Sequence, residues 1–388
     1  MNLSPEVKQS FPSVVRLRRA IHTYPERGFE EKRTCALIER TLRSAGVETK
    51  RICGTGVVGL VRGARPGPTI LIRADMDGLP VVEENAVPYK SKNVGTMHAC
   101  GHDGHVAMGL GAATLLQKSR KDLRGTVKFM FQPAEEGPGG AKPMIEAGLL
   151  ENPKVDAAFA IHMWNDLPTG KVGVRPGPVF AAADEFKMTV TGKGGHGAAP
   201  HQTIDPVVVA ANIITACQAV VSRKVDPVKT AVVTFGQIHG GSRNNIIPDS
   251  VFLNGTLRSF EEGIRRQLHR EVRRVAEGVA RSFGAEVEFE YLPGYPPTVN
   301  DPKMTELARE TVREFLGKPA AVEQDVTMGA EDMSYVLQEV PGCYMVLGSM
   351  NRAKGLTHPH HSARFDFDEE ALGIGVEIWS RLVRRFLS

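Results

Sequence analysis

The densest group of reactive side chains in this sequence lies at residues 97–105, which read MHACGHDGH. The stretch holds one thiol, three imidazoles and a carboxylate, in a chain with only five cysteines and twelve histidines. Cys100 and His102 are two residues apart, so their side chains share one face of an extended segment. A soft thiolate beside an imidazole suits a transition metal such as zinc. Alone, this pair is a weak signal, and its meaning depends on where the other ligand-type residues fall.

Further candidate ligands follow three strands that the sequence predicts at 69–72, 126–131 and 155–161. The first strand leads into Asp75 and Asp77, the second into Glu135 and Glu136, and the third ends in His162. Ligands of an open α/β sheet bind beyond the carboxyl ends of its strands. We therefore expect these side chains to converge with the Cys100–His102 loop and to form a metal cluster of Cys, His and carboxylate ligands.

Each of these features also has a structural explanation. Asp75 and Asp77 are typical of carboxylates that cap loops, and an acidic pair is common at the start of a helix. A histidine after a strand is often a hydrogen-bonded structural residue. The coincidence of all three strand ends favours the metal cluster. Adjacent glutamates add a mechanism, because Glu136 can bind metal while Glu135 deprotonates the water that the metal activates. This is the chemistry of amide or peptide hydrolysis.

The elements that must position these residues alternate between helix and strand, which is typical of an α/β layer architecture. Helices are expected at 5–22, 30–45, 103–117 and 143–147, around strands at 57–61, 69–72, 126–131 and 155–161. From residue 184 the order becomes β-α-β-β-α-β, which matches a ferredoxin-like split unit. Its elements are expected at 185–191, 204–222, 230–238, 251–258, 261–283 and 286–291.

After the segment PGYPP at 293–297, the α/β alternation resumes, with helices at 304–316 and 332–339, a strand at 343–347 and a C-terminal helix. We therefore predict a discontinuous α/β catalytic domain, residues 1–183 and 298–388, with an inserted α+β domain at 184–297. The length supports two domains, because 388 residues exceed the roughly 250–300 that one core usually serves.

Composition narrows the class of protein. The 41% hydrophobic and 24% charged residues are ordinary for a soluble globular chain. The net charge of +4 is small and its basic residues are scattered, so we expect no nucleic-acid partner. Five widely spread cysteines favour reduced thiols in the cytoplasm. The N-terminus starts a capped helix at Ser4-Pro5 rather than a signal segment, and we find no apolar run of about 20 residues, so we expect no membrane contact.

Several motifs occur together in an order that resembles a known family. They are DMD (75–77), MHACGHD (97–103), EEG (135–137), GKGGHG (192–197), ED (331–332) and HSARF (361–365). In combination they resemble the dinuclear metallo-amidohydrolase family of aminoacylases and carboxypeptidases, in the branch of hippurate, auxin-conjugate and N-acyl-L-amino acid hydrolases. The resemblance covers essentially the whole chain. It implies a mixed-sheet catalytic domain of the zinc-exopeptidase type, in which the inserted domain serves as lid and dimerisation domain.

The resemblance also implies a role for particular residues. Two divalent ions, zinc or manganese with cobalt or nickel as alternatives, would be bound by Cys100, His102, Glu136, His162 and His361. Glu135 would be the general base, and Asp77 would orient a ligand histidine. His196, often supplied by the partner subunit, would donate a hydrogen bond to the oxyanion. Asn245 and Arg258 would contact the substrate carboxylate.

The sequence departs from the family pattern at a few positions. The wider family has a metal-binding histidine where this chain has Asp75, but the hippurate-type branch shares the aspartate, so Asp75 is not expected to bind metal directly. Gly78 stands where the branch usually has alanine. His358, His360 and His361 crowd the C-terminal motif. Alignment to the following Arg-Phe-Asp-Phe favours His361 as the ligand, and His360 is the alternative.

We therefore predict a metal-dependent amidohydrolase that cleaves N-acyl-L-amino acids to a carboxylic acid and a free amino acid, as a homodimer or a dimer of dimers. A carboxypeptidase or dipeptidase on the same machinery is the close rival, and an N-acetyl-diaminopimelate deacetylase is a third possibility. From another class, a non-catalytic metal-dependent binding protein is disfavoured, because storing a metal requires no general base.

Overall fold

Apolar strands build an eight-stranded mixed sheet in the computed structural model, which describes residues 3–388. The strand order is β1-β2-β4-β3-β5-β16-β6-β15. β3 pairs in parallel with both β4 and β5, and β5 pairs in parallel with β16. The carboxyl ends of these four strands therefore meet at one edge of the sheet. The strands span Glu48–Ile52 (β1), Gly56–Arg62 (β2), Arg65–Asp75 (β3), Arg124–Gln132 (β4), Ala157–Pro168 (β5), Val172–Gly173 (β6), Ala321–Val322 (β15) and Gly342–Met350 (β16).

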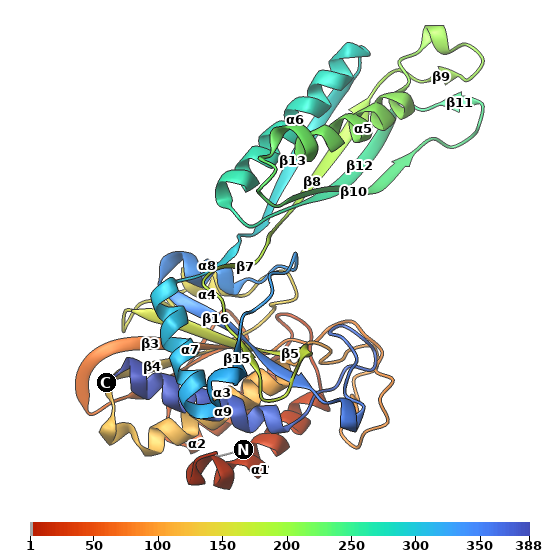
Figure 1. Cartoon of the computed structure of the whole chain (residues 1–388). Helices are drawn as coiled ribbons and strands as arrows, with labels where there is room; N and C mark the ends of the chain where they lie inside the picture. The colour runs from red at the N-terminus through yellow and green to blue at the C-terminus, as the bar shows by residue number, and fades with distance from the viewer. Residues whose placement is uncertain (1–2) are drawn as a thin grey trace. The chain divides into compact units, whose positions relative to one another are not determined.

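Helices α1, α3 and α9 pack against one another beside this sheet (Figure 1). The middle helix, α3, is almost wholly buried. Its Gly111 lets α1 and α9 approach closely, because a Cβ there would lie 2.8 Å from Val14 and 3.0 Å from Val376. The helices associated with this sheet are α1 (Pro5–His22), α2 (Lys32–Ser44), α3 (His102–Lys118), α4 (Ala141–Glu146), α7 (Pro302–Leu316), α8 (Met333–Glu339) and α9 (Glu370–Phe386).

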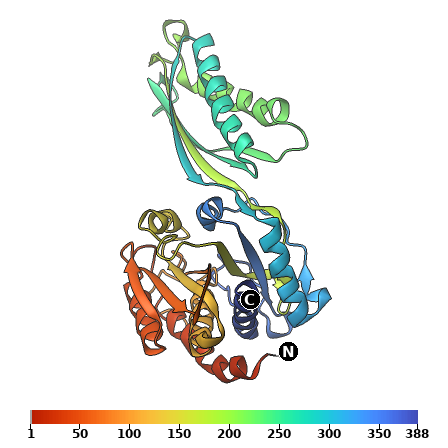
Figure 2. The same cartoon turned by 90° about the vertical axis from the view of Figure 1, so that its left-hand side faces the viewer.

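A separate four-stranded antiparallel sheet has the order β10-β12-β8-β13. Both of its helices lie on one side of it (Figure 2). Every second residue of β8 is buried, as at Phe186, Met188 and Val190, so this face forms the core with the helices. The element order β-α-β-β-α-β is the predicted one. The elements are β8 (Ala182–Thr191), α5 (Pro206–Lys224), β10 (Ala231–Gly240), β12 (Ser250–Ser259), α6 (Glu262–Ser282) and β13 (Glu286–Tyr295).

The chain divides into two compact units. The large unit comprises Met1–Gly177, Val299–Asp325 and Asp332–Ser388, and the small unit comprises Pro178–Thr298 and Val326–Glu331. Strands β7 (Gly177–Phe180) and β14 (Thr298–Asn300) span points where the chain passes between units. β9 (Gly195–His196) and β11 (Ile246–Ile247) pair within the small unit. Short 3₁₀ turns occupy Arg120–Asp122, Pro200–Gln202, Lys318–Ala320 and Arg352–Lys354.

Helix α5 is, within residues 3–388, the one helix long and apolar enough to cross a membrane by length and composition. The segment passes this test although polar residues such as Asn212, Thr215 and Gln218 interrupt it, so it is not a continuous apolar run of about 20 residues. The helix buries Val209, Ile213 and Val220 against the four-stranded sheet, while Asn212 and Thr215 are exposed. Core helices of soluble proteins have the same composition, so α5 is weak evidence for a membrane span.

Candidate active site

The edge of the eight-stranded sheet where β3 and β4 end carries the predicted acidic residues. Asp75 is the last residue of β3, and Asp77 follows it. Glu135 and Glu136 follow β4 in a loop whose Ala134 has a positive φ of 54°. The backbone N–H of Glu136 donates to Asp77 Oδ2 at 3.0 Å, so the two loops are joined directly.

His102 is oriented by Asp77. Its Nδ1 lies 3.0 Å from the carbonyl oxygen of Asp77 and 3.2 Å from Asp77 Oδ1. Both atoms are acceptors, so in the neutral ring, the form that binds metal, Nδ1 carries the proton and Nε2 keeps its lone pair. That Nε2 is buried without a hydrogen bond in the described part of the chain. It lies 4.0 Å from an oxygen of each glutamate, Glu135 Oε2 and Glu136 Oε1. A metal-binding histidine typically has its other ring N–H held by a carboxylate or a carbonyl oxygen in this way.

His162 and Cys100 face each other. His162 Nδ1 donates to the carbonyl oxygen of Met163 at 2.6 Å, which leaves the Nε2 lone pair 3.5 Å from Cys100 Sγ. The expectation that His162 stands at the end of its strand is wrong, because β5 continues to Pro168. Within β5, alternation of side chains aims His162 at the site. Cys100 lies just before α3, whose first residue is His102.

The two C-terminal histidines are placed differently. His361 has a positive φ of 65°, and its backbone N–H donates to the carbonyl oxygen of Ala99 at 2.8 Å. Its Nε2 lies 3.2 Å from Glu136 Oε1. His360 instead accepts the backbone N–H of Asn165 at its Nε2, at 3.1 Å. The geometry therefore favours His361 over His360 as the candidate C-terminal metal ligand, because the His361 ring lies beside Glu136.

His105 has both ring nitrogens occupied. Its Nε2 accepts the backbone N–H of Met163 at 2.8 Å, and its Nδ1 faces Asp75 Oδ1. Asp75 also accepts a hydrogen bond from Arg73 Nη1 at 2.5 Å. Although Asp75, His102, His105 and His162 are close enough to suit one ion, these partners leave His105 no lone pair for it. Arg73 is a further residue of the site that was not predicted, although it is a charged residue between the apolar run 69–72 and Asp75.

The charge balance of the site favours a cation. Burial, together with the carboxylates of Glu136 and Glu135, raises the pKa of the Cys100 thiol well above its usual range. Burial alone would lower the pKa of His102, but the charge of Asp75 and the hydrogen bond to Asp77 outweigh it and raise that pKa to about 10. Without a metal, bound protons balance the charge of this group of thiol and carboxylates. A divalent ion can supply that positive charge instead.

The donor set fits a metal. The ligand atoms of Cys100, His102 and Glu136 all lie within 4.8 Å of one another. Thiolate, imidazole and carboxylate are the ligand types that zinc accepts, and imidazole with carboxylate also serves other first-row ions. His162 Nε2 extends the set on the Cys100 side and His361 on the Glu136 side. Five predicted ligands thus converge within the large unit.

The other three predicted residues belong to the small unit. β9 pairs with β11, which places His196 opposite Ile246, and the N–H of Gly197 donates to the carbonyl oxygen of Asn245 at 2.9 Å. His196 and Asn245 are therefore neighbours. Arg258 lies apart from them, near the far end of β12, and lines a hollow of about 540 Å³ on this sheet. Its Nη1 donates to Thr256 and to the carbonyl oxygen of Leu257.

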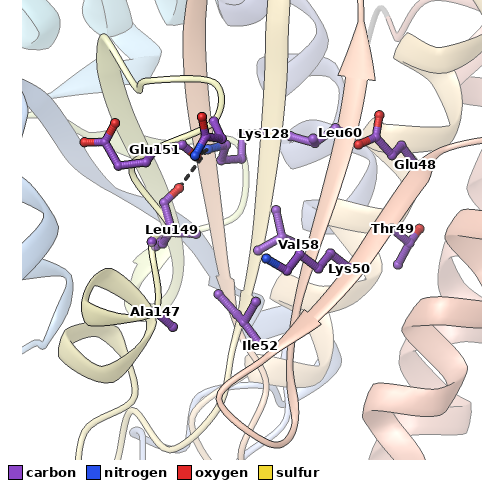
Figure 3. Close-up of a pocket in the computed structure, with 12 residues that line it drawn as sticks. Glu48, Thr49, Lys50, Ile52, Val58, Leu60, Lys128, Ala147, Leu149 and Glu151 are labelled. Carbon is purple, nitrogen blue, oxygen red and sulfur yellow. Dashed lines mark hydrogen bonds between the residues drawn. The ribbon is translucent and has the colours of Figure 1, made fainter.

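A different cavity of the large unit, of about 210 Å³, lies beside β1, β2 and β4 and contains none of the predicted ligands (Figure 3). Its buried Lys128 has a structural role. The Nζ donates to the carbonyl oxygens of Leu149 (2.8 Å), Glu151 (2.9 Å) and Pro153 (2.8 Å), so it holds the loop after α4. Burial lowers the pKa of this lysine to about 8.

Comparison with known proteins identifies the family. The model of peptidase family M20/M25/M40 matches residues 71–385. The chain belongs to this family. It is 42% identical to thermostable carboxypeptidase 1 of Saccharolobus solfataricus, over 99% of this chain and 98% of that one. It is 43% identical to an N-acyl-L-amino acid amidohydrolase of Geobacillus stearothermophilus, over 74% and 78%.

A solved M20 structure supports the same conclusion. A dinuclear metal-binding peptidase of Bacillus subtilis superimposes with a TM-score of 0.87 at 36% identity, and the match covers 98% of this chain and 99% of that one. Membership of the M20 family makes the protein a hydrolase of amide bonds with the mixed α/β fold predicted for it. The metal-binding character of the family agrees with the cluster of ligand-type residues at the sheet edge.

Proposed function

We propose that this M20 enzyme hydrolyses the amide bond of N-acyl-L-amino acids. Two divalent ions, zinc or manganese by the ligand types and cobalt or nickel as alternatives, would be held by Cys100, His102, Glu136, His162 and His361. The observation that carries the proposal is the pair of fixed tautomers. In their neutral forms, His102 and His162 each present an Nε2 lone pair to the space that Cys100 and Glu136 share. Glu135 stands beside that space, as a general base must.

The geometry supports the proposed roles. When bound, divalent ions supply Lewis acidity that polarises the amide carbonyl and makes water a better nucleophile. Glu135 takes a proton from the attacking water and returns it to the nitrogen of the leaving amine. The Asp77 carboxylate accepts hydrogen bonds from the Nδ1–H of His102 and from the backbone N–H of Glu136. One carboxylate therefore aligns a histidine and the loop that carries the general base.

His196 has the tautomer that an oxyanion donor needs. Its Nδ1 accepts the backbone N–H of Ala198 at 3.0 Å, so the proton of the neutral ring is on Nε2. The residue is exposed on β9. We propose that it stabilises the negative charge of the tetrahedral intermediate, and that Asn245 and Arg258 bind the substrate carboxylate.

Arg258 and His196 belong, in this proposal, to sites completed by two chains. His196 lies by the Ser250 end of β12, since the N–H groups of Gly192 and Gly194 donate to Asp249. Arg258 is eight residues along the same strand, roughly 26 Å away at about 3.3 Å per residue. That span exceeds the length of a small substrate. One substrate would therefore contact Arg258 of one protomer and His196 of the other.

The small unit, predicted at 184–297, would be the lid and dimerisation domain. β10 is an edge strand of its sheet, and its Ile238 is 52% exposed. The unpaired backbone groups of an exposed edge strand can form hydrogen bonds with a strand of another chain. On α5, Val207 (43%) and Val208 (46%) are also exposed. We propose that these features face a second copy in a homodimer, which can pair further as a dimer of dimers.

His196→Ala is expected to lower kcat by roughly 10²–10³-fold, the usual cost of losing one oxyanion donor. KM should change little, because the hydrogen bond forms mainly in the transition state. Steady-state kinetics on the best N-acyl amino acid measures both constants. An unchanged kcat would remove His196 from the mechanism.

Mixing subunits tests whether His196 acts across the dimer. Random pairing of His196→Ala with Glu135→Gln chains makes half of the dimers mixed, and each mixed dimer has one complete site if His196 acts on the partner subunit. Activity should then rise to about a quarter of the wild-type value. If His196 acts within its own chain, the mixture stays inactive.

A panel of N-acetyl amino acids, N-benzoyl amino acids, N-acetyl-diaminopimelate and dipeptides, with and without chelator, tests the substrate class. We expect turnover of N-acyl amino acids that a chelator abolishes and added Zn²⁺ or Mn²⁺ restores. Preference for peptides would favour the carboxypeptidase or dipeptidase alternative, which the relative from Saccharolobus supports. Metal binding without any turnover would favour the non-catalytic alternative.

All five cysteines are free, which is in keeping with the cytoplasmic location that we propose.

A further inference from the structure

The Asp332 carboxylate is fully buried behind the loop that carries Glu135 and Glu136. The loop runs from the end of β4 to the start of α4, and Asp332 contacts both of its ends. At the first end, Gln132 Nε2 donates to both carboxylate oxygens at 2.7 Å. At the second, the backbone N–H groups of Gly140 and Ala141 donate to Asp332 Oδ2 at 3.0 and 2.9 Å.

The two ends of this loop touch. A Cβ on Gly140 would lie 1.9 Å from the carbonyl oxygen of Pro133, so only glycine fits there. Within the loop, Ala134 keeps a left-handed conformation at φ 54°, which is unusual for a residue with a side chain. Such a closed, strained loop requires support from its surroundings. The Asp332 carboxylate provides it, because one group accepts hydrogen bonds from both ends.

Arg73 joins this support to the metal ligands. Its Nη2 donates to Asp332 Oδ1 at 3.1 Å, its Nε to Gln132 Oε1 at 2.9 Å, and its Nη1 to Asp75 at 2.5 Å. Asp75 in turn faces His105, whose Nε2 accepts the N–H of Met163. One buried network therefore connects the loop of the base with the strand that presents His162.

We propose that Asp332 is a positioning residue, which holds the Glu135–Glu136 loop in its catalytic conformation through Gln132, Gly140 and Ala141. This inference rests on the proposed function, since it assumes that Glu135 is the base. Asp332 acts on the reaction through the loop and through Arg73.

Asp332→Asn tests the proposal with little change of shape. An asparagine places an NH₂ group where one carboxylate oxygen now accepts hydrogen bonds, so it faces donors of Gln132, Arg73 or the loop backbone. We expect kcat to fall about 10–100-fold, because a displacement of about 1 Å can cost 10²-fold. KM should stay within about twofold of the wild type, and the metal content by mass spectrometry should be unchanged.

Asp301→Ala is the control for stability. Asp301 Oδ1 caps helix α7 by accepting the N–H of Met304 at 2.9 Å, so alanine there removes a partly buried backbone hydrogen bond, which usually costs about 0.5–2 kcal/mol of stability. Its melting temperature should fall while kcat stays at the wild-type value. A lower kcat in Asp332→Asn alone then reports the loop rather than a general loss of stability.

Gln132→Met provides a second variant that leaves the buried charges of Arg73 and Asp332 paired, in case Asp332→Asn fails to fold. It removes the tie at one end of the loop, so we expect kcat to fall about tenfold at unchanged KM and metal content. A wild-type kcat in either folded variant overturns the proposal, as does a fall that follows metal loss in proportion. If the wild type hydrolyses nothing in the substrate panel, the proposed function fails instead.

Discussion

Glu135→Gln is expected to lower kcat by roughly 10²–10⁴-fold, the range that a positioned general base contributes. Glutamine keeps the size of the side chain but cannot take a proton from water. Glu135 is buried, with 7% of its surface exposed, and its Oε2 lies 4.0 Å from His102 Nε2. It is therefore close enough to serve water at the site. The comparison requires wild type and variant loaded with the same metal, assayed on one N-acyl amino acid.

Glu136→Gln is the control for this prediction, because the neighbouring glutamate has a different proposed role. Glu136 Oε1 lies 3.2 Å from His361 Nε2, and its oxygen belongs to the group with Cys100 and His102. Its loss should lower metal content together with activity, whereas Glu135→Gln should keep both ions. If Glu135→Gln keeps its turnover, Glu135 is not the base. If it loses metal, Glu135 is a ligand.

Much of the fold could be predicted because the pattern of apolar residues changes where one helix or strand ends and the next begins. Apolar runs such as 69–72 and 126–131 became β3 and β4, and Gly46 ends the second helix region with a positive φ of 76°. β1 was missed because its segment ETKRI is polar and mostly exposed, so it carries no apolar alternation. Pairing with β2, a tertiary effect, decides that strand.

The residues that converge at the candidate site could be predicted, whereas the orientation of their side chains could not. The spacing of Cys100 and His102 and the acidic strand ends pointed to the site. Which nitrogen of His102 or His162 faces it depends on acceptors at Asp77 and Met163, and only the fold brings these together. The same holds for His105, which looks like a ligand in the sequence and has both nitrogens occupied in the structure.

The buried residues that support the site could not be identified from the sequence, because they lie far apart along the chain. Arg73 and Asp332 are 259 residues apart in sequence, yet their side chains are hydrogen-bonded. A buried arginine between two carboxylates is costly unless all its partners are present. A single sequence shows only that Arg73 is a charge within an apolar strand, and no local pattern identifies its counterions.

Cys100→Ser is expected to weaken metal binding by about 100-fold or more, since removing a group that only hydrogen-bonds to a ligand already costs roughly 10–100-fold. The thiolate is a soft, charged ligand, and a serine hydroxyl stays neutral and binds zinc poorly. Metal titration with a competing chelator measures the affinity, and the activity should fall with occupancy. Cys217→Ser is the control, because Cys217 is buried in the core of the small unit, whereas the predicted ligands belong to the large unit. Unchanged affinity in Cys100→Ser would remove this residue from the site.

The pH dependence of metal binding separates loss of the thiolate from a general disturbance. Burial and the charges of Glu136 and Glu135 raise the pKa of Cys100, and the pKa of His102 is raised to about 10, so without metal both hold protons at neutral pH. Each must lose its proton to bind an ion, and affinity therefore rises with pH below these pKa values. The wild type should release about two protons per site from this pair, and Cys100→Ser about one, measured by calorimetry in buffers of different ionisation enthalpy. Equal proton release by both proteins would mean that Cys100 does not bind the metal as a thiolate, even if its replacement weakens binding.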